Sequence, residues 1–290
     1  MSTETSFVTT ESGLAPRRAG VIGLGMIGGA VATSLARSGR LSSVYDIRSD
    51  AADNLAGVPA PAASPADVGH DSDVVLLAVV DADQARNVLF ADDGVLSRAR
   101  PGLIVVLLST VAVPVVYELA ERCSQSDVTL LDCGVTQAKP DGLVAMLGGD
   151  DIVVAAAMPV LADVATVVHC GPLGAGMATK IARNVITYGT WRAVHEAATL
   201  VESAGVDPHK LITVVEEADP EGTTLFSWLH NRLAAPDDVR AMVPQVRRLM
   251  DKDLAAAQEL AARSQIPVPL VDAARANGAE TLAIPDNELP

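Results

Sequence analysis

The first 170 residues alternate between short, almost wholly apolar runs and longer stretches in which apolar residues recur at helical spacing. Apolar runs without alternation are typical of strands that are buried on both faces of a parallel sheet. The apolar runs occupy residues 19–22, 73–80, 103–108, 128–132 and 144–149, and helical spacing covers 82–90 and 114–123. The pattern predicts an α/β domain with a doubly wound parallel sheet.

The pattern changes beyond Gly174, where no convincing strand remains and helical segments are separated by glycine and proline. Residues 178–203 predict one long helix that ends before Gly205, and residues 251–264 predict a second helix. We therefore expect three parts, the second joined to the third by the long helix. They are a flexible tail over 1–16, the α/β domain over 17–172, and an all-α substrate and oligomerisation domain over 173–290.

A glycine-rich turn follows the first apolar run. Gly23, Gly25 and Gly28 fit the pattern G-x-G-x-x-G and precede an alanine-rich, helix-like stretch. In this motif the first glycine makes a tight turn, and the second lets the backbone approach a pyrophosphate. The third lets the helix pack closely on the strand. Free N–H groups at the helix start favour the phosphates. The chain therefore predicts a Rossmann-type dinucleotide-binding domain.

Asp46 ends the next strand-like run, 21 residues beyond Gly25. A carboxylate at this place suits two free ribose hydroxyls and repels a 2′-phosphate, which favours NAD. Arg48 could instead turn toward a 2′-phosphate, so NADP stays open; the alternative is a solvent-facing side chain. The residues expected to contact the cofactor here are Gly23, Leu24, Gly25, Met26, Ile27, Gly28, Asp46, Arg48, Val79 and Val80.

Composition narrows the range of partners. The formal net charge is −15 at pH 7, and the chain has no basic cluster of the kind that nucleic acid requires. Anionic membrane surfaces are disfavoured for the same reason, and no apolar run reaches membrane-spanning length. A small anionic substrate would need local positive groups that overrule this global charge.

The cysteines and histidines indicate neither a metal site nor a disulfide framework. Cys123, Cys133 and Cys170 are odd in number and lack metal-ligand spacing, which fits buried thiols in a reducing compartment. The five histidines are scattered. The first fifteen residues have neither a positive start nor a sustained apolar segment, so they do not read as a signal peptide. We expect a cytoplasmic protein that requires no metal.

A second cluster of small residues opens the predicted long helix. Lys180 and Asn184 follow it and lie four residues apart, so they project from the same helix face. A lysine near a cleft can donate a proton to a carbonyl oxygen, or accept it in reverse, once burial lowers its pKa. Asn184 can then orient the lysine or the substrate oxygen. From spacing alone, a surface lysine with an asparagine neighbour is the more frequent arrangement.

Four ordered motifs together resemble the β-hydroxyacid dehydrogenase family, which includes 3-hydroxyisobutyrate dehydrogenase and tartronate semialdehyde reductase. Besides the glycine-rich turn and the lysine–asparagine stretch, Asp132–Ala138 falls where the family usually has Asp-x-Pro-Val-Ser-Gly-Gly. Lys252-Asp253-Leu254 falls on its Lys-Asp-Leu motif in the C-terminal domain. The resemblance spans residues 19–276 in the right order and domain arrangement.

The resemblance implies roles for individual residues. Lys180 would be the catalytic acid/base and Asn184 its partner. It also implies a small, carboxylate-bearing substrate and a homodimer or homotetramer. Further roles fall to Ser109 and Thr110 beside the nicotinamide and substrate, Thr136, Gln137 and Ala138 at the substrate carboxylate, Lys252 toward the cofactor, and Asp253 in the pocket wall. For Lys252 and Asp253 the alternative is an ordinary solvated helix face, and Asp132 fits a structural strand-end residue better than a catalytic acid.

Departures from the family pattern place the substrate in question. The chain has Gly134-Val135-Thr136-Gln137-Ala138 where the family usually has Pro-Val-Ser-Gly-Gly, and Gln245 where many members carry an aromatic residue. We expect dehydrogenase chemistry to survive these changes and substrate specificity to differ. The alternatives are an imine reductase of the same fold, in which Asp or Tyr usually replaces the lysine, and a catalytically silent cofactor-binding scaffold.

Overall fold

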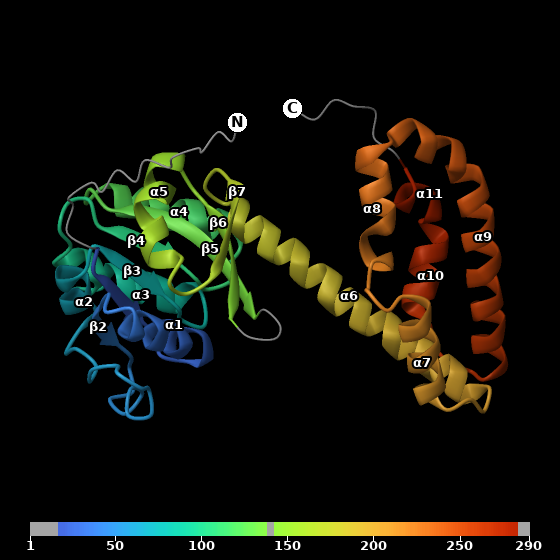
Figure 1. The fold of residues 1–290 in the computed structure, drawn as a ribbon, viewed down its shortest axis with the longest axis horizontal. Helices are drawn as coiled ribbons and strands as arrows, with labels where there is room; N and C mark the ends of the chain where they lie inside the picture. The colour runs from blue at the N-terminus through green and yellow to red at the C-terminus, as the bar shows by residue number, and fades with distance from the viewer. Residues whose placement is uncertain (1–16, 138–141, 284–290) are drawn as a thin grey trace, which may run out of the picture. The chain divides into compact units, whose positions relative to one another are not determined.

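The computed structural model describes residues 17–137 and 142–283. The chain divides into two compact units, residues 1–184 and 185–290, and the division falls within the long helix α6 (Ala175–Ser203). Figure 1 shows the sheet and its covering helices in the first unit and the helices of the second. The predicted flexible tail, residues 1–16, lies outside the described residues.

The first unit is built on one sheet of seven strands in the order β2-β1-β3-β4-β5-β6-β7. All neighbouring strands are parallel except β5 and β6. The predicted α/β fold with a mostly parallel sheet is therefore confirmed. The strands are β1 (Ala19–Ile22), β2 (Leu41–Tyr45), β3 (Val74–Leu77), β4 (Ile104–Leu107), β5 (Thr129–Gln137), β6 (Leu143–Gly148) and β7 (Thr166–Gly171).

The antiparallel pair β5–β6 departs from the fully parallel sheet expected from the apolar runs. Only five residues separate the end of β5 at Gln137 from the start of β6 at Leu143. A parallel crossover needs a dozen or more residues, so this connection can only reverse the chain. The pattern also missed β7, whose Thr166-Val167-Val168 start is a short β-branched run.

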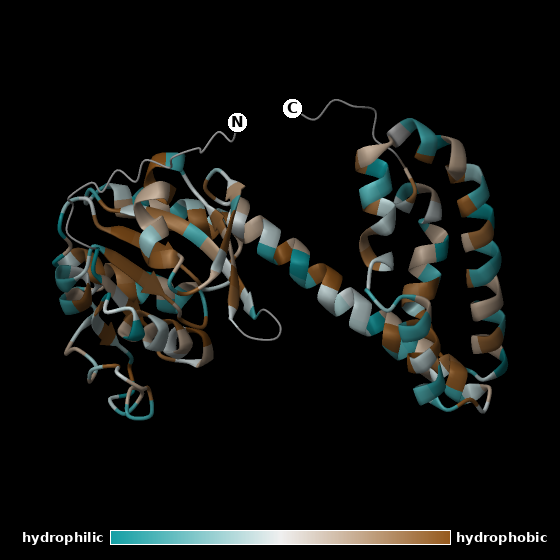
Figure 2. Ribbon diagram, in the orientation of Figure 1, coloured by the Kyte–Doolittle hydropathy of each residue, from teal (hydrophilic) through white to brown (hydrophobic). Residues whose placement is uncertain are grey.

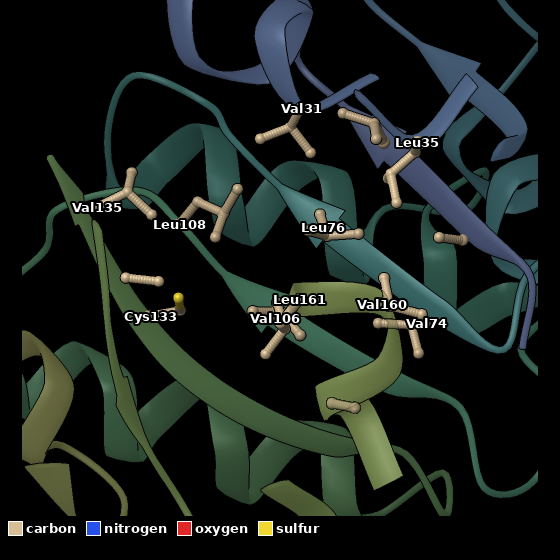
Figure 3. Packing of buried hydrophobic residues seen from close by; sticks show 14 of the residues in the cluster. Val31, Leu35, Val74, Leu76, Val106, Leu108, Cys133, Val135, Val160 and Leu161 are labelled. Carbon is tan, nitrogen blue, oxygen red and sulfur yellow. The ribbon is translucent and has the colours of Figure 1, made fainter. Parts of the chain in front are cut away.

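Helices cover both faces of the sheet because strand side chains alternate between them. Val74 and Leu76 of β3 belong to one buried cluster, with residues of α1 and α5, whereas Val75 and Leu77 belong to the other, with residues of α2, α3 and α4. Figure 3 shows part of the first cluster. The helices are α1 (Met26–Arg37), α2 (Pro65–Asp71), α3 (Ala82–Phe90), α4 (Val113–Ser124) and α5 (Asp151–Leu161), with a 3₁₀ turn at Val95–Ser97.

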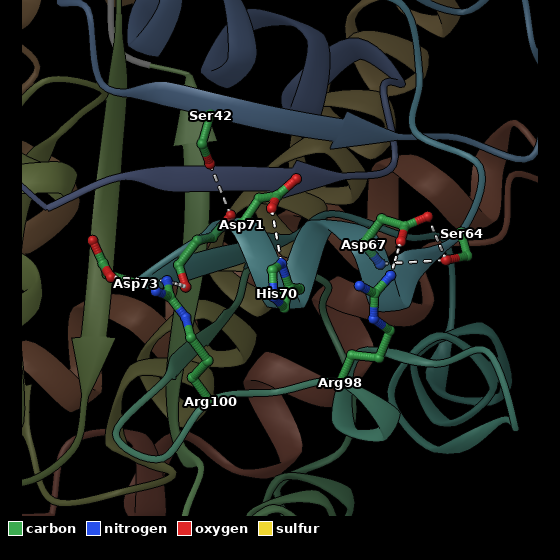
Figure 4. Close-up of polar contacts among 9 residues, drawn as sticks. Ser42, Ser64, Asp67, His70, Asp71, Asp73, Arg98 and Arg100 are labelled. Atoms are coloured by element: carbon green, nitrogen blue, oxygen red, sulfur yellow. Dashed lines mark hydrogen bonds and ion pairs between the residues drawn. The ribbon is translucent and has the colours of Figure 1, made fainter.

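Polar contacts fix the short helix α2, as Figure 4 shows. The Ser64 hydroxyl accepts a hydrogen bond from the backbone N–H of Asp67 at 3.3 Å, which caps the helix start. Arg98 pairs with the Asp67 carboxylate, and Arg100 pairs with Asp73 at 3.2 Å just beyond the helix. α2 is therefore held at both ends.

Within its described residues, the second unit contains helices joined by short connections and no strand, as the sequence predicts. The predicted helix over 178–203 is confirmed within α6, and the predicted helix over 251–264 is the last part of a longer helix. Pro236 begins that helix, at a position where a missing N–H removes no helical hydrogen bond. Its helices after α6 are α7 (Pro208–Ala218), α8 (Thr224–Ala234), α9 (Pro236–Arg263), α10 (Pro269–Ala276) and α11 (Gly278–Thr281).

The core of the second unit is small. Its buried cluster consists of Leu200, Ala261, Val268 and Val271, with partly buried neighbours from α9. Helices α7 and α8 bury no residue, and Figure 2 shows hydrophobic positions along both. Among the described residues, no helix combines the length and the apolar character needed to cross a membrane.

Candidate active site

The glycine-rich turn has the geometry that dinucleotide binding requires, one glycine at a time. Gly23 has φ +86°, and a Cβ atom on it would lie 2.4 Å from the carbonyl oxygen of Ala78. A Cβ on Gly28 would lie 1.7 Å from the carbonyl oxygen of Gly23. A Cβ on Gly25 would meet nothing within 4 Å. The first and third glycines therefore serve the turn and the helix packing, and the second faces open space at the start of α1.

A cavity of about 670 Å³ lies beside this turn. Its walls include Gly23, Gly25, Asp46, Val79 and Val80, which are five of the residues expected to contact the cofactor. The N-cap residue of α1 is Gly25 and no side chain caps the helix, so its first N–H groups remain available to phosphate. The site fits a dinucleotide.

Asp46 is held in the position expected of a ribose ligand. Its Oδ2 accepts a hydrogen bond from the Leu24 N–H at 2.7 Å, and its Oδ1 accepts one from the Arg48 N–H at 2.9 Å. Burial raises the pKa of the Asp46 carboxyl, but these bonds and the nearby Arg48 guanidinium outweigh it, and the pKa lies below its ordinary value. Asp46 is therefore ionised at neutral pH.

Other expected cofactor residues lie in contrasting environments. The Leu24 side chain is buried, Ile27 is half-buried, and Met26 and Val80 are exposed. Arg48 is exposed, with its Nε 3.4 Å from Asp46 Oδ1. Thr110 is exposed, whereas Ser109 is buried and its hydroxyl donates a hydrogen bond to the carbonyl oxygen of Val79 at 2.7 Å.

The register of the sheet places Ser109 and Gly134 at the same edge of the sheet as the glycine-rich turn. Strands β1, β3 and β4 end at Ile22, Leu77 and Leu107, respectively. These residues lie in one row across the sheet, which continues to Asp132 of β5. Two residues beyond this row lie Val79, Ser109 and Gly134. Three interstrand spacings, about 14 Å in all, separate β1 from β5. The carboxyl edge of the sheet therefore joins the turn to Gly134.

Lys180 lies against this edge. It exposes only 9% of its surface, and among the described residues no hydrogen bond or ion pair engages its ammonium group. Burial lowers the pKa of Lys180, and the neighbouring Arg183 guanidinium lowers it further. Asn184, one turn along α6, is half-buried. The structure thus departs from the surface lysine that spacing alone favours.

Gly134 of β5 lies directly against the side chain of Lys180. A Cβ atom on Gly134 would lie 2.3 Å from the Cβ of Lys180 and 2.8 Å from its Cγ. In the sequence, Gly134 stands out only as a departure from the family pattern in the expected substrate segment. Its role as the contact of Lys180 was missed because a strand-to-helix contact 46 residues apart leaves no local signal.

Asp132 anchors the start of the helix that carries Lys180. Its carboxylate is fully buried, and its two oxygens accept hydrogen bonds from the N–H groups of Gly174 and Met177, each at 2.6 Å. The interpretation of Asp132 as a structural strand-end residue therefore acquires a specific contact, the first turn of α6.

The expected substrate segment is described in part. Thr136 is half-buried and Gln137 is exposed at the end of β5, and Ala138 lies outside the described residues. Thr136 lies on the same strand face as Asp132 and Gly134, because side chains alternate along a strand. In the second unit, Lys252 and Asp253 are exposed and pair with each other at 3.0 Å.

Comparison with known proteins identifies the family. Residues 18–172 match the profile of the NAD binding domain of 6-phosphogluconate dehydrogenase. Residues 174–283 match the profile of the NAD-binding of NADP-dependent 3-hydroxyisobutyrate dehydrogenase. An uncharacterised oxidoreductase of Mycobacterium tuberculosis is 31% identical over 92% of this chain and 94% of its own. The chain belongs to the β-hydroxyacid dehydrogenase family.

The chain is also similar to an enzyme of named activity and to a protein of known structure. L-threonate dehydrogenase of Cupriavidus necator is 31% identical over 89% of this chain and 88% of that enzyme. The crystal structure of a putative oxidoreductase from Mycobacterium avium matches 93% of this chain and all of that chain, with 30% identity and a TM-score of 0.79.

Imine reductases share the fold of this β-hydroxyacid dehydrogenase family member. The imine reductase from Pseudomonas sp. matches 93% of this chain and 97% of that chain, with a TM-score of 0.72 and 19% identity. Within the described residues, no three or more His, Cys, Asp or Glu side chains are placed to hold a metal ion.

Proposed function

We propose that this protein is an NAD(P)-dependent dehydrogenase that interconverts a small hydroxyacid and its carbonyl counterpart, with Lys180 as the proton donor and acceptor. The observation that carries the proposal is the place of Lys180. It is a buried lysine with no partner among the described residues, at the sheet edge that also bears the glycine-rich turn. A dinucleotide extended along this edge from Gly25 would bring its nicotinamide toward Gly134 and Lys180.

The chain's own residues would supply binding and proton transfer. The bound nicotinamide would supply the hydride acceptor in oxidation and the hydride donor in reduction. Neutral Lys180 would take the proton from the substrate hydroxyl during oxidation, and its ammonium form would return a proton during reduction. The burial that lowers the pKa of Lys180 brings it closer to the working pH, where general acid–base catalysis is most efficient.

Asn184 and Thr136 would orient the substrate around Lys180. Lys180 and Asn184 share a face of α6, and Thr136 lies two residues beyond Gly134 on the same face of β5. From Gly134 to Thr136 the strand advances about 6.8 Å, and from Lys180 to Asn184 the helix advances about 6 Å. A hydroxyl and an amide would therefore flank a substrate carboxylate, with Gln137 and Ala138 continuing the strand.

The substrate class follows from the relatives and from the site. L-threonate dehydrogenase and NAD-dependent L-serine dehydrogenase are named for substrates that carry a carboxylate and a hydroxyl group. We assign this chain a small substrate of the same kind. Lys252 and Asp253 would reach the cofactor and the pocket wall, respectively, as the family pattern implies.

NAD is the preferred cofactor under this proposal. Both Asp46 oxygens are fixed by backbone N–H groups and the pKa of the carboxyl is lowered, so a negative charge stands where a 2′-phosphate would lie. Arg48, already paired with Asp46, has part of its charge committed. Initial rates with NAD and NADP should therefore differ at least tenfold in kcat/KM in favour of NAD.

A homodimer or homotetramer in the cytoplasm completes the proposal. The second unit exposes large apolar side chains, including Trp191 at 65% and Leu233 at 71%. Exposed apolar surface of this extent is typical of an interface between subunits. The three cysteines are free, as expected in a reducing compartment.

The test of Lys180 is its replacement by alanine. Loss of a general acid–base group lowers turnover by about 10²–10⁴-fold. We expect that loss in Lys180→Ala, with NAD affinity by fluorescence titration unchanged within a factor of two. Lys210→Ala, which removes an exposed lysine from α7, is the matched control and should retain full turnover. Near-normal turnover of Lys180→Ala would remove Lys180 from the mechanism.

A substrate panel tests the reaction class. Hydroxyacids, semialdehydes and cyclic imines are each assayed at 340 nm with NAD(H) and NADP(H). The proposal requires turnover of at least one hydroxyacid or its carbonyl counterpart above any imine. Preference for imines would assign the chain to the other activity of this fold, and tight NAD binding without turnover of any compound would indicate a silent scaffold.

A further inference from the structure

Strands β5 and β6 contact the start of helix α6, and successive residues on one face of β5 contact successive turns of the helix. Asp132, Gly134 and Thr136 lie on one face of this strand, because residues two apart point the same way. Asp132 contacts the first turn of α6, and Gly134 contacts Lys180 in the second. The strand advances about 6.8 Å between Asp132 and Gly134. The helix advances about 6 Å over the four residues that end at Lys180, so the two elements stay in step.

We propose that Asp132 and Gly134 are positioning residues for Lys180, with Asp132 fixing where α6 starts and Gly134 setting how closely the lysine stem approaches β5. The inference rests on the proposed function only in taking Lys180 as the proton-transfer group. The contacts themselves hold whatever reaction the protein catalyses.

Asp132 holds the helix start without a cationic partner. Both carboxylate oxygens are occupied by N–H groups of the α6 start, at 2.6 Å each, and within the described residues no Lys, Arg or His forms an ion pair with it. The charge is stabilised by these two N–H groups and by the positive end of the helix dipole. Because the carboxylate is fully buried, a shift of α6 would break these two hydrogen bonds and leave both carboxylate oxygens buried without a donor.

Two glycines allow α6 to pack closely against β5 and β6. A Cβ on Gly176 would lie 2.3 Å from the carbonyl oxygen of Met146, and a Cβ on Gly148 would lie 2.3 Å from Asp132 Oδ1. The first turn of α6 thus rests directly on the backbone of β5 and β6. The helix cannot slide along the strands without a collision, so the height of Lys180 above β5 is fixed by Asp132 at one point and by Gly134 at the next.

Burial of Lys180 follows from this approach. The pKa of Lys180 is lowered by burial and by Arg183, and Gly134 carries no charge that could act on it directly. A change at Gly134 therefore reaches the lysine only through the position of its side chain. Adding a methyl group at Gly134 displaces the Lys180 stem outward, toward water, where the ammonium form is favoured.

The experiment measures the pKa of Lys180 without requiring activity. The full-length protein has four lysines, Lys139, Lys180, Lys210 and Lys252. Trace acetylation with acetic anhydride over a pH series, quantified at each lysine by mass spectrometry, gives a midpoint for each. Gly134→Ala should raise the Lys180 midpoint by at least half a pH unit, and Asp132→Asn should raise it by less, since the amide keeps one acceptor oxygen. The midpoint of exposed Lys210 should not move.

The matched control is Glu196→Gln. Glu196 is also a buried carboxylate that caps a helix start, and it lies on the same helix, about 24 Å along its axis from Lys180. Glu196→Gln should lower the thermal midpoint and leave the Lys180 labelling midpoint and the pH profile of kcat unchanged. In Gly134→Ala the acid–base limb of the kcat profile should follow the labelling midpoint, with at least a tenfold fall in kcat and little change in KM for NAD.

Two results would overturn the inference. One is an unchanged Lys180 midpoint in both Asp132→Asn and Gly134→Ala, and the other is an equal shift in Glu196→Gln. If Gly134→Ala does not fold, Asp132→Asn decides alone. Failure of the proposed function is separate, because it shows as full turnover in Lys180→Ala while the labelling midpoints still report the position of the lysine.

Discussion

Each unit holds one helix start with a buried carboxylate, and the surroundings of the two carboxylates differ. Asp132 accepts hydrogen bonds from the start of α6. Glu196 accepts them from Leu270 and Val271 at the start of α10, and also from Arg192. Around Asp132 two extensive clusters of buried apolar residues fill both faces of a sheet. Around Glu196 the buried cluster has four residues.

The two units therefore obtain their stability from different kinds of contact. In the first unit, helices on both faces of the sheet bury β1, β3 and β4 completely, so apolar packing carries most of its stability. The second unit leaves α7 and α8 without a buried residue, so polar contacts such as those of Glu196 carry more of its order. The tryptophans and cysteines make the comparison measurable. Both tryptophans, Trp191 and Trp228, lie in the second unit, and all three cysteines lie in the first.

The largest expected difference comes from the same truncation in each core. Leu76→Ala removes a fully buried side chain from the interior strand β3 and should lower the free energy of unfolding of the first unit by about 3–5 kcal/mol. Leu200→Ala, at the edge of the smaller core, should cost about 2 kcal/mol. Urea unfolding followed by circular dichroism and by tryptophan fluorescence separates the units. Equal losses of unfolding free energy in the two variants would contradict the proposed difference between the two cores.

Loss of the Glu196 charge should destabilise the second unit by about 1–3 kcal/mol, because buried N–H groups lose an acceptor. Burial raises the pKa of Glu196, but hydrogen bonds from Leu270, Arg192 and Val271 outweigh it and hold the pKa below its usual value. The stabilisation is therefore present above the unfolded-state pKa and lost as pH falls through the lower folded-state value.

Tryptophan fluorescence checks that sign. The thermal midpoint of the wild-type second unit should fall as the pH drops below about 4.5, the ordinary pKa of a glutamate, and Glu196→Gln should flatten that fall while starting lower at pH 7. A pH dependence that remains as steep in the variant would show that other groups control the acid lability.

Charge on the apolar surface of the second unit should separate subunits. Leu233→Asp on α8 should weaken self-association at least tenfold, about 1.4 kcal/mol, as measured by sedimentation velocity over a concentration series. Ile152→Asp is the matched control, since Ile152 is 81% exposed on α5 of the first unit. Equal effects of the two substitutions, or a wild-type monomer, would remove the proposed interface from the second unit.

The smallest effect concerns the thiols of the first unit. Burial raises the pKa of both Cys123 and Cys133 to about 12. At pH 8 iodoacetamide should modify half-exposed Cys170 and leave the other two unmodified, because the thiolate is the reactive form. Leu76→Ala should speed modification of Cys123 through transient opening, and Glu196→Gln should not. Mass spectrometry of the labelled peptides checks both expectations.

The turn and the strands were predictable because their causes are local. Three glycines at fixed spacing, an acid at a strand end and continuous apolar runs each carry their own signal. The burial of Lys180 was not predictable from spacing, because it depends on Gly134, which is distant along the chain. The antiparallel pairing of β5 and β6 was within reach of the sequence, since a five-residue connection cannot cross over. The long extent of α9 was obscured by its own prolines.

The reversal of the chain after β5 also has a consequence for the substrate segment. The pairing of β5 with β4 ends at Asp132, whereas its pairing with β6 continues to Gln137. Residues 133–137 therefore belong to a hairpin arm that projects past the shared ladder. Under the proposed function, substitutions at Thr136 and Gln137, at the outer end of this arm, would alter the substrate side while the pairing of β5 with β4 stays intact.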